Sequence, residues 1–237
     1  MLPVAILAGG LATRLRPLTE RVPKALLPVN GEPFIAHQLR LLEAAGIERV
    51  VLCVGYLGER ILEFVGDGAR FGLTVEFCFD GPVLLGTAGA VKMALPRLGR
   101  QFFVLYGDSY LPCDYRSVMT AFESSGKEAL MTVYRNEGQW DASNIYFADD
   151  RILAYDKSSP SSRMRHIDYG LGVFRNSAFA AVAGSEPYDL AVLYQELLRR
   201  DELAGVEIRE RFYEIGSAEG LRDLSEFLAG RAKSRAD

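Results

Sequence analysis

The sequence predicts an α/β fold with a mainly parallel sheet, and three observations support this. Short, uninterrupted apolar runs recur along the first half of the chain, as expected for strands that are buried on both faces. Segments with apolar residues at helical spacing separate these runs. Strand and helix therefore alternate, which implies right-handed crossovers and helices on both faces of the sheet. The length of 237 residues suffices for one large domain or two small ones.

The first half supplies the elements in order. The expected strands are the apolar runs Val4 to Leu7, Arg49 to Val54, Thr74 to Phe79 and Gln101 to Tyr106. The expected helices are Pro33 to Ala45, Leu57 to Val65, a segment from Gly86 that Pro96 interrupts, and Tyr115 to Ser125. The first of these helices carries proline in its first turn and is followed by glycine, which is the usual asymmetry of helix ends.

The second half changes to shorter β-like runs separated by turn-rich segments. The runs are Leu130 to Tyr134, Ile145 to Phe147, Ile152 to Tyr155 and Ile167 to Phe174. They predict a small mixed β lobe rather than an independent domain. Two helices, 190–200 and 218–228, and a polar tail follow. We therefore expect a single domain, 1–237, made of a first part (1–127), a second part (128–217) and a C-terminal helix and tail (218–237).

Composition excludes several classes of protein. The net charge of −4 and the lack of a broad basic face argue against nucleic acid as a partner. No apolar run approaches membrane-spanning length, and no signal peptide is recognisable. Of the three cysteines, Cys53 and Cys78 lie in apolar strand runs, so we expect reduced core thiols in a cytoplasmic protein. The two histidines, His37 and His166, are too far apart in the sequence to suggest a zinc site.

The segment from Ile6 to Lys24 carries the strongest functional signal. Two adjacent glycines, Gly9 and Gly10, follow a buried strand and allow the backbone N–H groups to approach a bulky ligand. Four cations then occur within eleven residues, which indicates an anionic ligand: Arg14, Arg16, Arg21 and Lys24. Neither the Walker loop nor the dinucleotide fingerprint is present.

The complete pattern is Leu-x-Gly-Gly-x-x-Thr-Arg-x-x-Pro-x-Thr, followed by Pro-Lys-x-x-x-Pro. It resembles the signature of the sugar-1-phosphate nucleotidyltransferases, the NDP-sugar pyrophosphorylases. The resemblance implies the Rossmann-like nucleotide-diphospho-sugar transferase fold, in which 1–127 binds nucleotide and 128–217 forms the sugar-binding lobe. It also implies catalytic roles for Arg14 and Lys24. The nucleotide-binding residues that it implies at this loop are Leu7, Ala8, Gly9, Gly10, Thr13 and Arg14.

A second motif, Leu-Gly-Thr-Ala-Gly, opens the predicted helix at Gly86. Free N–H groups and small side chains at a helix start allow a flat base to approach. In the family that the sequence resembles, this segment contacts the nucleobase, which assigns Gly86 and Thr87 to nucleotide binding. Its form is most similar to guanylyltransferases that act on mannose- or heptose-type 1-phosphates.

Gly107-Asp108 ends the most strongly apolar strand, where open α/β sheets bind their ligands. It resembles the family's metal site, so Asp108 is expected to be catalytic and to bind Mg²⁺. The element around Tyr213-Glu214-Ile215 resembles the one that supplies the second metal ligand, here Glu214. Mg²⁺ favours one or two carboxylates together with substrate phosphates. Asp114 is a nearby alternative that is more typical of a turn or an N-cap.

The second part carries the expected sugar-phosphate site. Asp156-Lys157 resembles the family's Glu-Lys element, whose acid holds a sugar hydroxyl and whose lysine holds the sugar phosphate. Asp168 and Gly170 stand in a strand that lines the sugar pocket in the family, and Asn144 aligns loosely with a sugar-contacting position. Asp168 replaces an amide by an acceptor-only group, which predicts a changed pattern of hydroxyl contacts.

These features imply that a nucleoside triphosphate and a sugar 1-phosphate react to an NDP-sugar and pyrophosphate, with GTP and a mannose- or heptose-type 1-phosphate favoured. A homodimer is possible. Three alternatives remain open: a uridylyl- or cytidylyltransferase with another phosphorylated acceptor, a non-catalytic nucleotide-sugar sensor, and, more distantly, a nicotinamide dehydrogenase. The departures at Ala12, Asp168 and Glu214 favour the sensor, whereas intact Arg14, Lys24 and Asp108 favour the enzyme.

Overall fold

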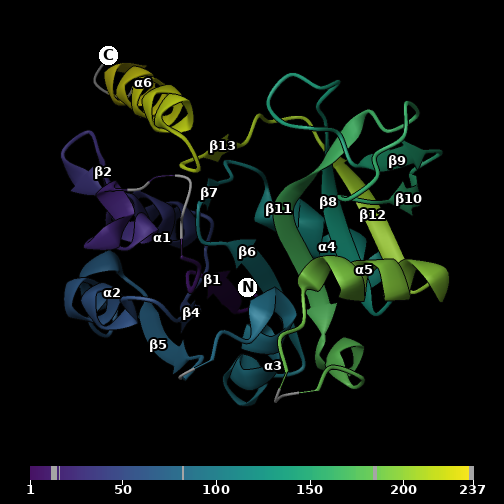
Figure 1. Cartoon of the computed structure of the whole chain (residues 1–237), viewed down its shortest axis with the longest axis horizontal. Coiled ribbons are helices and arrows are strands. Elements are labelled where there is room, and N and C mark those ends of the chain that lie inside the picture. The colour runs from purple at the N-terminus through teal and green to yellow at the C-terminus, as the bar shows by residue number, and fades with distance from the viewer. Residues whose placement is uncertain (12–14, 16, 82, 184–185, 235–237) are drawn as a thin grey trace.

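The computed structural model describes residues 1–11, 15, 17–81, 83–183 and 186–234, and it has three layers with a mixed sheet between helices (Figure 1). The helices are α1 (Phe34–Ala44), α2 (Gly58–Val65), α3 (Gly86–Leu98), α4 (Tyr115–Ser125), α5 (Leu190–Arg199) and α6 (Ala218–Ser234). The strands of the first part are β1 (Val4–Leu7), β2 (Pro28–Val29), β3 (Glu32–Pro33), β4 (Arg49–Val54), β5 (Thr74–Phe79), β6 (Gln101–Tyr106) and β7 (Ser109–Tyr110). Those of the second part are β8 (Ala129–Arg135), β9 (Ile145–Ala148), β10 (Arg151–Tyr155), β11 (His166–Arg175), β12 (Leu203–Ile208) and β13 (Tyr213–Glu214).

The parallel core of the sheet is β6-β1-β4-β5. Side chains alternate between the two faces, as strand geometry requires. Val4 and Ile6 of β1 pack toward α1, α2 and α4, whereas Ala5 packs toward α3 and α5. The register aligns Leu7 with Cys53 and Tyr106, so β1, β4 and β6 end at the same edge of the sheet.

The second part continues the sheet instead of forming a separate one. Strand β11 pairs antiparallel with β6 and with β8, and β8 pairs in parallel with β12. Strands β9 and β10 extend this side, so that nine strands of the described chain share one sheet. Outside it, β13 pairs with β7, and α6 packs there through a small apolar cluster that includes Ile215 and Leu224.

Three local differences from the sequence prediction have physical reasons. Helix α3 continues through Pro96 to Leu98, because the proline falls in the last turn, where few helical hydrogen bonds follow. Helix α6 runs beyond residue 228 to Ser234. Strand β12 was not expected, since Gly205 interrupts its apolar pattern; a Cβ atom there would lie 2.8 Å from Ile152 Cγ1, so the strand needs glycine for packing.

The cysteine prediction agrees with the structure, since Cys53 and Cys78 are buried free thiols. Burial raises the pKa of both thiols, which keeps them protonated and unreactive. Among the described residues, no helix has both the length and the apolar character needed to cross a membrane.

Candidate active site

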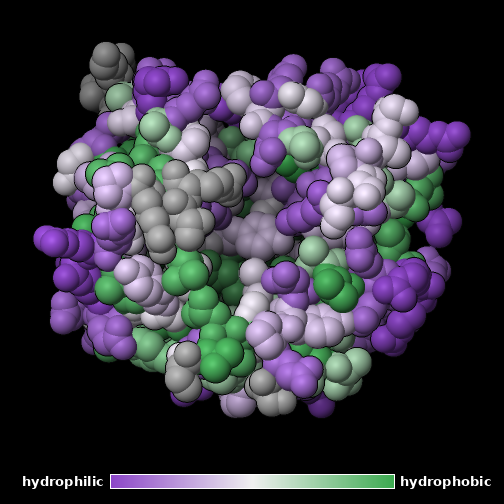
Figure 2. All heavy atoms as spheres, viewed as in Figure 1, coloured by the Kyte–Doolittle hydropathy of each residue, from purple (hydrophilic) through white to green (hydrophobic). Residues whose placement is uncertain are grey.

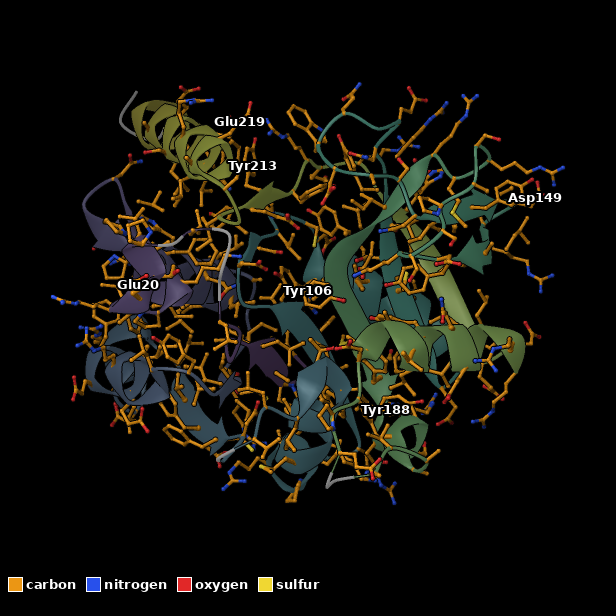
Figure 3. All side chains as sticks on the ribbon, viewed as in Figure 1. Glu20, Tyr106, Asp149, Tyr188, Tyr213 and Glu219 are labelled. Atoms are coloured by element: carbon orange, nitrogen blue, oxygen red, sulfur yellow. The ribbon has the colours of Figure 1, made fainter. Side chains whose placement is uncertain are left out.

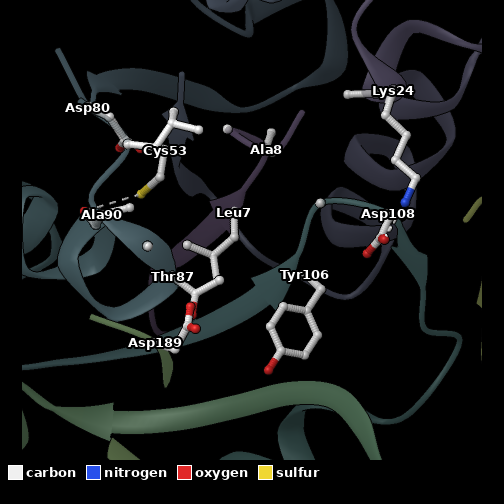
Figure 4. Close-up of a pocket in the computed structure, with 16 residues that line it drawn as sticks. Leu7, Ala8, Lys24, Cys53, Asp80, Thr87, Ala90, Tyr106, Asp108 and Asp189 are labelled. Atoms are coloured by element: carbon white, nitrogen blue, oxygen red, sulfur yellow. Dashed lines mark hydrogen bonds and ion pairs between the residues drawn. The ribbon is translucent and has the colours of Figure 1, made fainter. Parts of the chain in front are cut away.

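A cavity of about 300 Å³ opens where β1, β4 and β6 end (Figures 2 and 4). Its lining joins segments from both parts of the chain, from the loop after β1 to the residue that precedes α5. The predicted nucleotide-binding and catalytic residues that line it are Leu7, Ala8, Gly9, Gly10, Lys24, Gly86, Thr87 and Asp108. Thr13 and Arg14 lie outside the described residues.

The positions of Gly9, Gly10 and Gly107 around the cavity differ in why they hold glycine. A Cβ atom at Gly9 would lie 3.1 Å from the backbone nitrogen of Gly55, and one at Gly107 would lie 2.4 Å from Leu7 O. Both glycines therefore let neighbouring backbones pack closely. Gly10, in contrast, has no described atom within 4 Å of where its Cβ would be, so it faces open space on the cavity side.

Lys24 and Asp108 meet at one end of the cavity, although 84 positions separate them in the sequence (Figure 4). The Lys24 Nζ donates a hydrogen bond of 2.6 Å to Asp108 Oδ2. The side chains are 17% and 30% exposed, so the pair is sheltered and still reachable. A turn that begins at Lys24 and the loop directly after β6 position the two groups.

Glu214 reaches this pair through a long-range strand pairing. Glu214 is in register with Ser109 in the β13–β7 ladder, and the Ile215 N–H donates to Asp108 O at 3.0 Å. Burial is the main cause that raises the pKa of Glu214 to about 7, and the Asp108 carboxylate raises it further. The charges of Asp108 and Lys24 therefore reach Glu214 and act on its pKa in opposite directions, whereas Glu214 itself lines a neighbouring cavity with Tyr213 and Ser217.

The start of α3 is tied to the loop before α5. The N–H groups of Ala88 and Gly89 donate to Tyr188 O at 2.8 and 3.2 Å, and the Tyr188 N–H donates to Leu85 O. The N–H groups of Ala88 and Gly89 are therefore not free, whereas the prediction of free N–H groups concerned the helix start at Gly86 and Thr87. Gly86 has φ +72°, and a Cβ atom there would lie 2.8 Å from Tyr188 O, so this contact requires glycine.

Sequence reasoning missed Asp80, which lines the opposite end of the cavity from Lys24 (Figure 4). Only 9% of this residue is exposed, and burial raises the pKa of its carboxyl group. The Leu85 N–H lies 3.5 Å from Asp80 Oδ2, which is a long hydrogen bond. Asp80 follows β5 as Asp108 follows β6, so the rule that polar residues at strand ends line the crevice could have found it.

The predicted sugar-phosphate residues form a second cluster beside β11. Asn144 Oδ1 accepts from the Asp168 N–H at 3.3 Å, and Asp156 Oδ1 accepts from the N–H groups of Ser158 and Ser159. Lys157 Nζ lies 3.6 Å from Asp168 Oδ2. Tyr106, which is labelled in Figure 3, connects the two clusters: it lines the cavity, and its hydroxyl donates to Asp168 Oδ2 at 3.0 Å.

Asp114, the alternative metal ligand, is instead an N-cap. Its Oδ1 accepts from the backbone N–H groups of Arg116 and Ser117 at the start of α4. The Ser117 hydroxyl also donates to Asp114 Oδ2 at 2.6 Å, and this bond, followed by the backbone bonds, lowers the pKa of the carboxyl group. Both carboxylate oxygens are thus used by the helix start.

Comparison with known proteins agrees with this geometry. Residues 4–141, more than half of the chain, match the family model described as nucleotidyl transferase. The chain belongs to the nucleotidyl transferase family. This nucleotidyltransferase is 27% identical to the N-acetylmuramate α-1-phosphate uridylyltransferase of Neisseria meningitidis over 96% of its own length and 98% of the relative's.

Other relatives differ in the base. The nucleotidyltransferase is 37% identical over 136 residues to a mannose-1-phosphate guanyltransferase of Gibberella zeae, and the match covers 56% of this chain and 37% of that relative. A solved structure from Bacillus anthracis, assigned as a glucose-1-phosphate thymidylyltransferase, superposes with a TM-score of 0.85 at 20% identity. It covers 96% of this chain and 95% of that one, which establishes the predicted fold. Each name specifies a nucleotidyl group and a sugar 1-phosphate, whereas the bases are uracil, guanine and thymine.

Proposed function

We propose that the protein is a sugar-1-phosphate nucleotidyltransferase that uses GTP and a mannose- or heptose-type 1-phosphate and releases pyrophosphate. The observation that carries this is the Lys24–Asp108 pair at the mouth of a cavity formed by strand ends. A cation and an acid placed there suit two phosphorylated substrates, and the family membership gives the reaction class.

In the proposed reaction a phosphate oxygen of the sugar phosphate bonds to the α-phosphorus of the triphosphate. The bond from that phosphorus to the bridging oxygen breaks, and pyrophosphate leaves with the electron pair. The attacking phosphate is already largely ionised near neutral pH, since its second pKa is about 6. No general base is required, so catalysis depends on alignment and on neutralising charge.

Lys24 supplies positive charge at the α-phosphate, and Lys157 receives the incoming phosphate. Asp108 and Glu214 suit a divalent cation. Burial is the main cause that raises the pKa of Glu214, and the Asp108 carboxylate adds to it through negative charge that a cation would offset. These two residues would hold Mg²⁺, which when bound would supply positive charge that offsets the repulsion between the two substrates.

The chemistry of the far end of the cavity supports guanine. Asp80 is acceptor-only when ionised, and a carboxylate can accept two parallel bonds from the N1–H and the N2 amino group of guanine. Uracil and thymine offer one donor between two carbonyl groups, which a carboxylate would repel. Asp80 lies at the end of the cavity remote from Lys24, where the base would lie if the phosphates reach the lysine.

A uridylyl enzyme is the second candidate, because the Neisseria relative matches over nearly its whole length. A grid of four nucleoside triphosphates against a panel of sugar 1-phosphates, with released pyrophosphate as the readout, separates the two. GTP turnover with a mannose- or heptose-type phosphate supports the proposal. Preference for UTP would contradict the base, and nucleotide-sugar binding without pyrophosphate release would identify a sensor.

The variant Asp80→Asn tests the base assignment directly. Good bidentate base contacts discriminate by about 1–3 kcal/mol, so wild-type protein should prefer GTP to inosine triphosphate, which lacks the N2 amino group, by about tenfold or more. The variant should lose most of this preference and gain activity with UTP, because an amide offers one donor and one acceptor. Asp149→Asn, in an exposed turn, serves as the control. An unchanged GTP/ITP ratio in Asp80→Asn would rule out this reading of the base.

A further inference from the structure

Asp168 is a carboxylate that is almost completely enclosed by the protein. It lies on β11, where the register with β8 becomes irregular between Asp168 and Gly172, and only 3% of its side chain is exposed. A buried carboxylate must find hydrogen-bond donors within the protein, because it has given up those of water.

Three groups of the chain satisfy this carboxylate. The Tyr106 hydroxyl donates to Oδ2 at 3.0 Å, and the Gly170 N–H donates to Oδ1 at 3.0 Å. Lys157 Nζ lies 3.6 Å from Oδ2 and supplies a positive charge. Both oxygens are therefore engaged, and the small exposed area leaves little room for a sugar hydroxyl.

Lys157, in contrast, is both held and reachable. Its ammonium group lies 5.3 Å from the ring centroid of Tyr106 and 5.9 Å from that of Tyr155. Aromatic faces attract a cation at this range. The lysine side chain is 44% exposed, so the ammonium can still meet an incoming anion.

We propose that Asp168 is a positioning residue, which fixes the Lys157 ammonium group for the acceptor phosphate and does not itself contact the substrate. This inference rests on the proposed function, in which Lys157 binds the phosphate of the sugar. It differs from the hydroxyl contact that the family resemblance implies for this position. The sugar hydroxyls are then recognised elsewhere.

The Asp168 carboxylate also holds Tyr106, a residue that lines the cavity shared by Lys24 and Asp80. Burial and the nearby Asp168 charge raise the pKa of Tyr106, so its hydroxyl remains a donor to Asp168. Because Lys157 is exposed and Tyr106 is partly buried against the core, neutralising Asp168 should displace the lysine more than the tyrosine.

The test combines Asp168→Asn, Lys157→Met and the double variant, with pyrophosphate release measured against each substrate in turn. Asn is isosteric, so it retains an acceptor for the Gly170 N–H, and the Tyr106 oxygen can accept from its amide. Loss of the charged contact should raise KM for the sugar 1-phosphate about tenfold, which is about 1.4 kcal/mol. KM for the triphosphate and kcat should change by less than about threefold.

The double variant decides whether Asp168 acts through Lys157. If it does, adding Asp168→Asn to Lys157→Met should leave KM for the sugar phosphate unchanged, since the interaction is already lost. Additive effects would overturn the proposal. A panel of deoxy-sugar 1-phosphates gives a second measure: if removal of one hydroxyl lowers kcat/KM in wild-type protein but not in Asp168→Asn, the residue contacts that hydroxyl and the proposal is wrong.

A control variant and a structural readout distinguish failure of this inference from failure of the proposed function. Glu207→Gln removes one negative charge from the same sheet, beside His166, and should leave KM unaltered. Wild-type protein without pyrophosphate release for any substrate pair would refute the proposed function. In that case a crystal structure of Asp168→Asn still tests the inference: an unmoved Lys157 ammonium group would overturn it, and a displaced one would support it.

Discussion

Replacing Lys24 by methionine should slow turnover severely with little loss of folding. The substitution keeps most of the side-chain volume and removes the charge that lies 2.6 Å from Asp108 Oδ2. A group that stabilises charge developing in a transition state commonly contributes about 2.7–4 kcal/mol to the barrier. We therefore expect kcat to fall by a factor of about a hundred to a thousand.

The cost in stability should be smaller. The Lys24–Asp108 pair is sheltered but not enclosed, and a bond to a charged group of this kind contributes about 1–2 kcal/mol. For a chain of this size that corresponds to a decrease in Tm of about 2–8 °C. Lys24 also lowers the pKa of Glu214, so loss of Lys24 should raise that pKa further. Glu214 then binds a proton more readily, which reduces the negative charge around the unpaired Asp108.

Released pyrophosphate and thermal unfolding of the same preparations measure the two effects. Lys127→Met is the matched control, because it removes a lysine whose Nζ lies 2.9 Å from Asp201 Oδ2 outside the lining of the cavity. The control should lose less than about 1 kcal/mol and keep full activity, as expected for a surface ion pair. A folded Lys24→Met protein with activity within about threefold of wild type would refute the assignment.

Three further predictions concern the acids and the α3 contact. In metal-free buffer Glu214→Gln should be more stable than wild type at pH 8. Burial raises the folded pKa of Glu214 from 4.5 to about 7, so the favourable contribution of this group to stability is complete below pH 4.5 and is lost as the pH rises through 7, by about 3 kcal/mol in all. Equal Tm differences between variant and wild type at pH 5.5 and pH 8 would contradict this. Mg²⁺ should raise Tm of the wild type but not of Asp108→Asn, and a rise in both would place the ion elsewhere. Gly86→Ala should lower Tm more than Gly126→Ala, since both have positive φ but only Gly86 has Tyr188 within 3 Å of the added Cβ; equal losses would show that backbone strain alone matters.

The parallel core was predictable because its strands are buried on both faces. Strands of this kind have continuous apolar sequences, and the expected bounds 49–54, 74–79 and 101–106 agree with β4, β5 and β6. The sequence could not reveal that β11 joins β6, because apolar runs do not specify which edge they pair with. The predicted end of α6 near residue 228 lies just before Gly230, a residue that often ends helices, yet the helix continues through this glycine to Ser234.

The candidate site was likewise predictable only in part. The long loop motif placed Lys24 near Asp108, since strand ends and their loops meet at one edge of a parallel sheet. Glu214 lies in that neighbourhood only because β13 pairs with β7, which is a contact between distant segments that the sequence does not encode locally. The enclosure of Asp168 likewise depends on Tyr106 from another strand.

The pairing of β13 with β7 has a consequence for the order in which the protein becomes competent. The lysine, the first acid and most of the crevice come from residues 7–108, whereas Asp189 of the crevice and the second acid, Glu214, follow much later in the sequence. A chain that ends before residue 189 therefore lacks both of these acids. In the proposed function, the site is therefore complete only once β13 has paired with β7 and α6 has packed beside them.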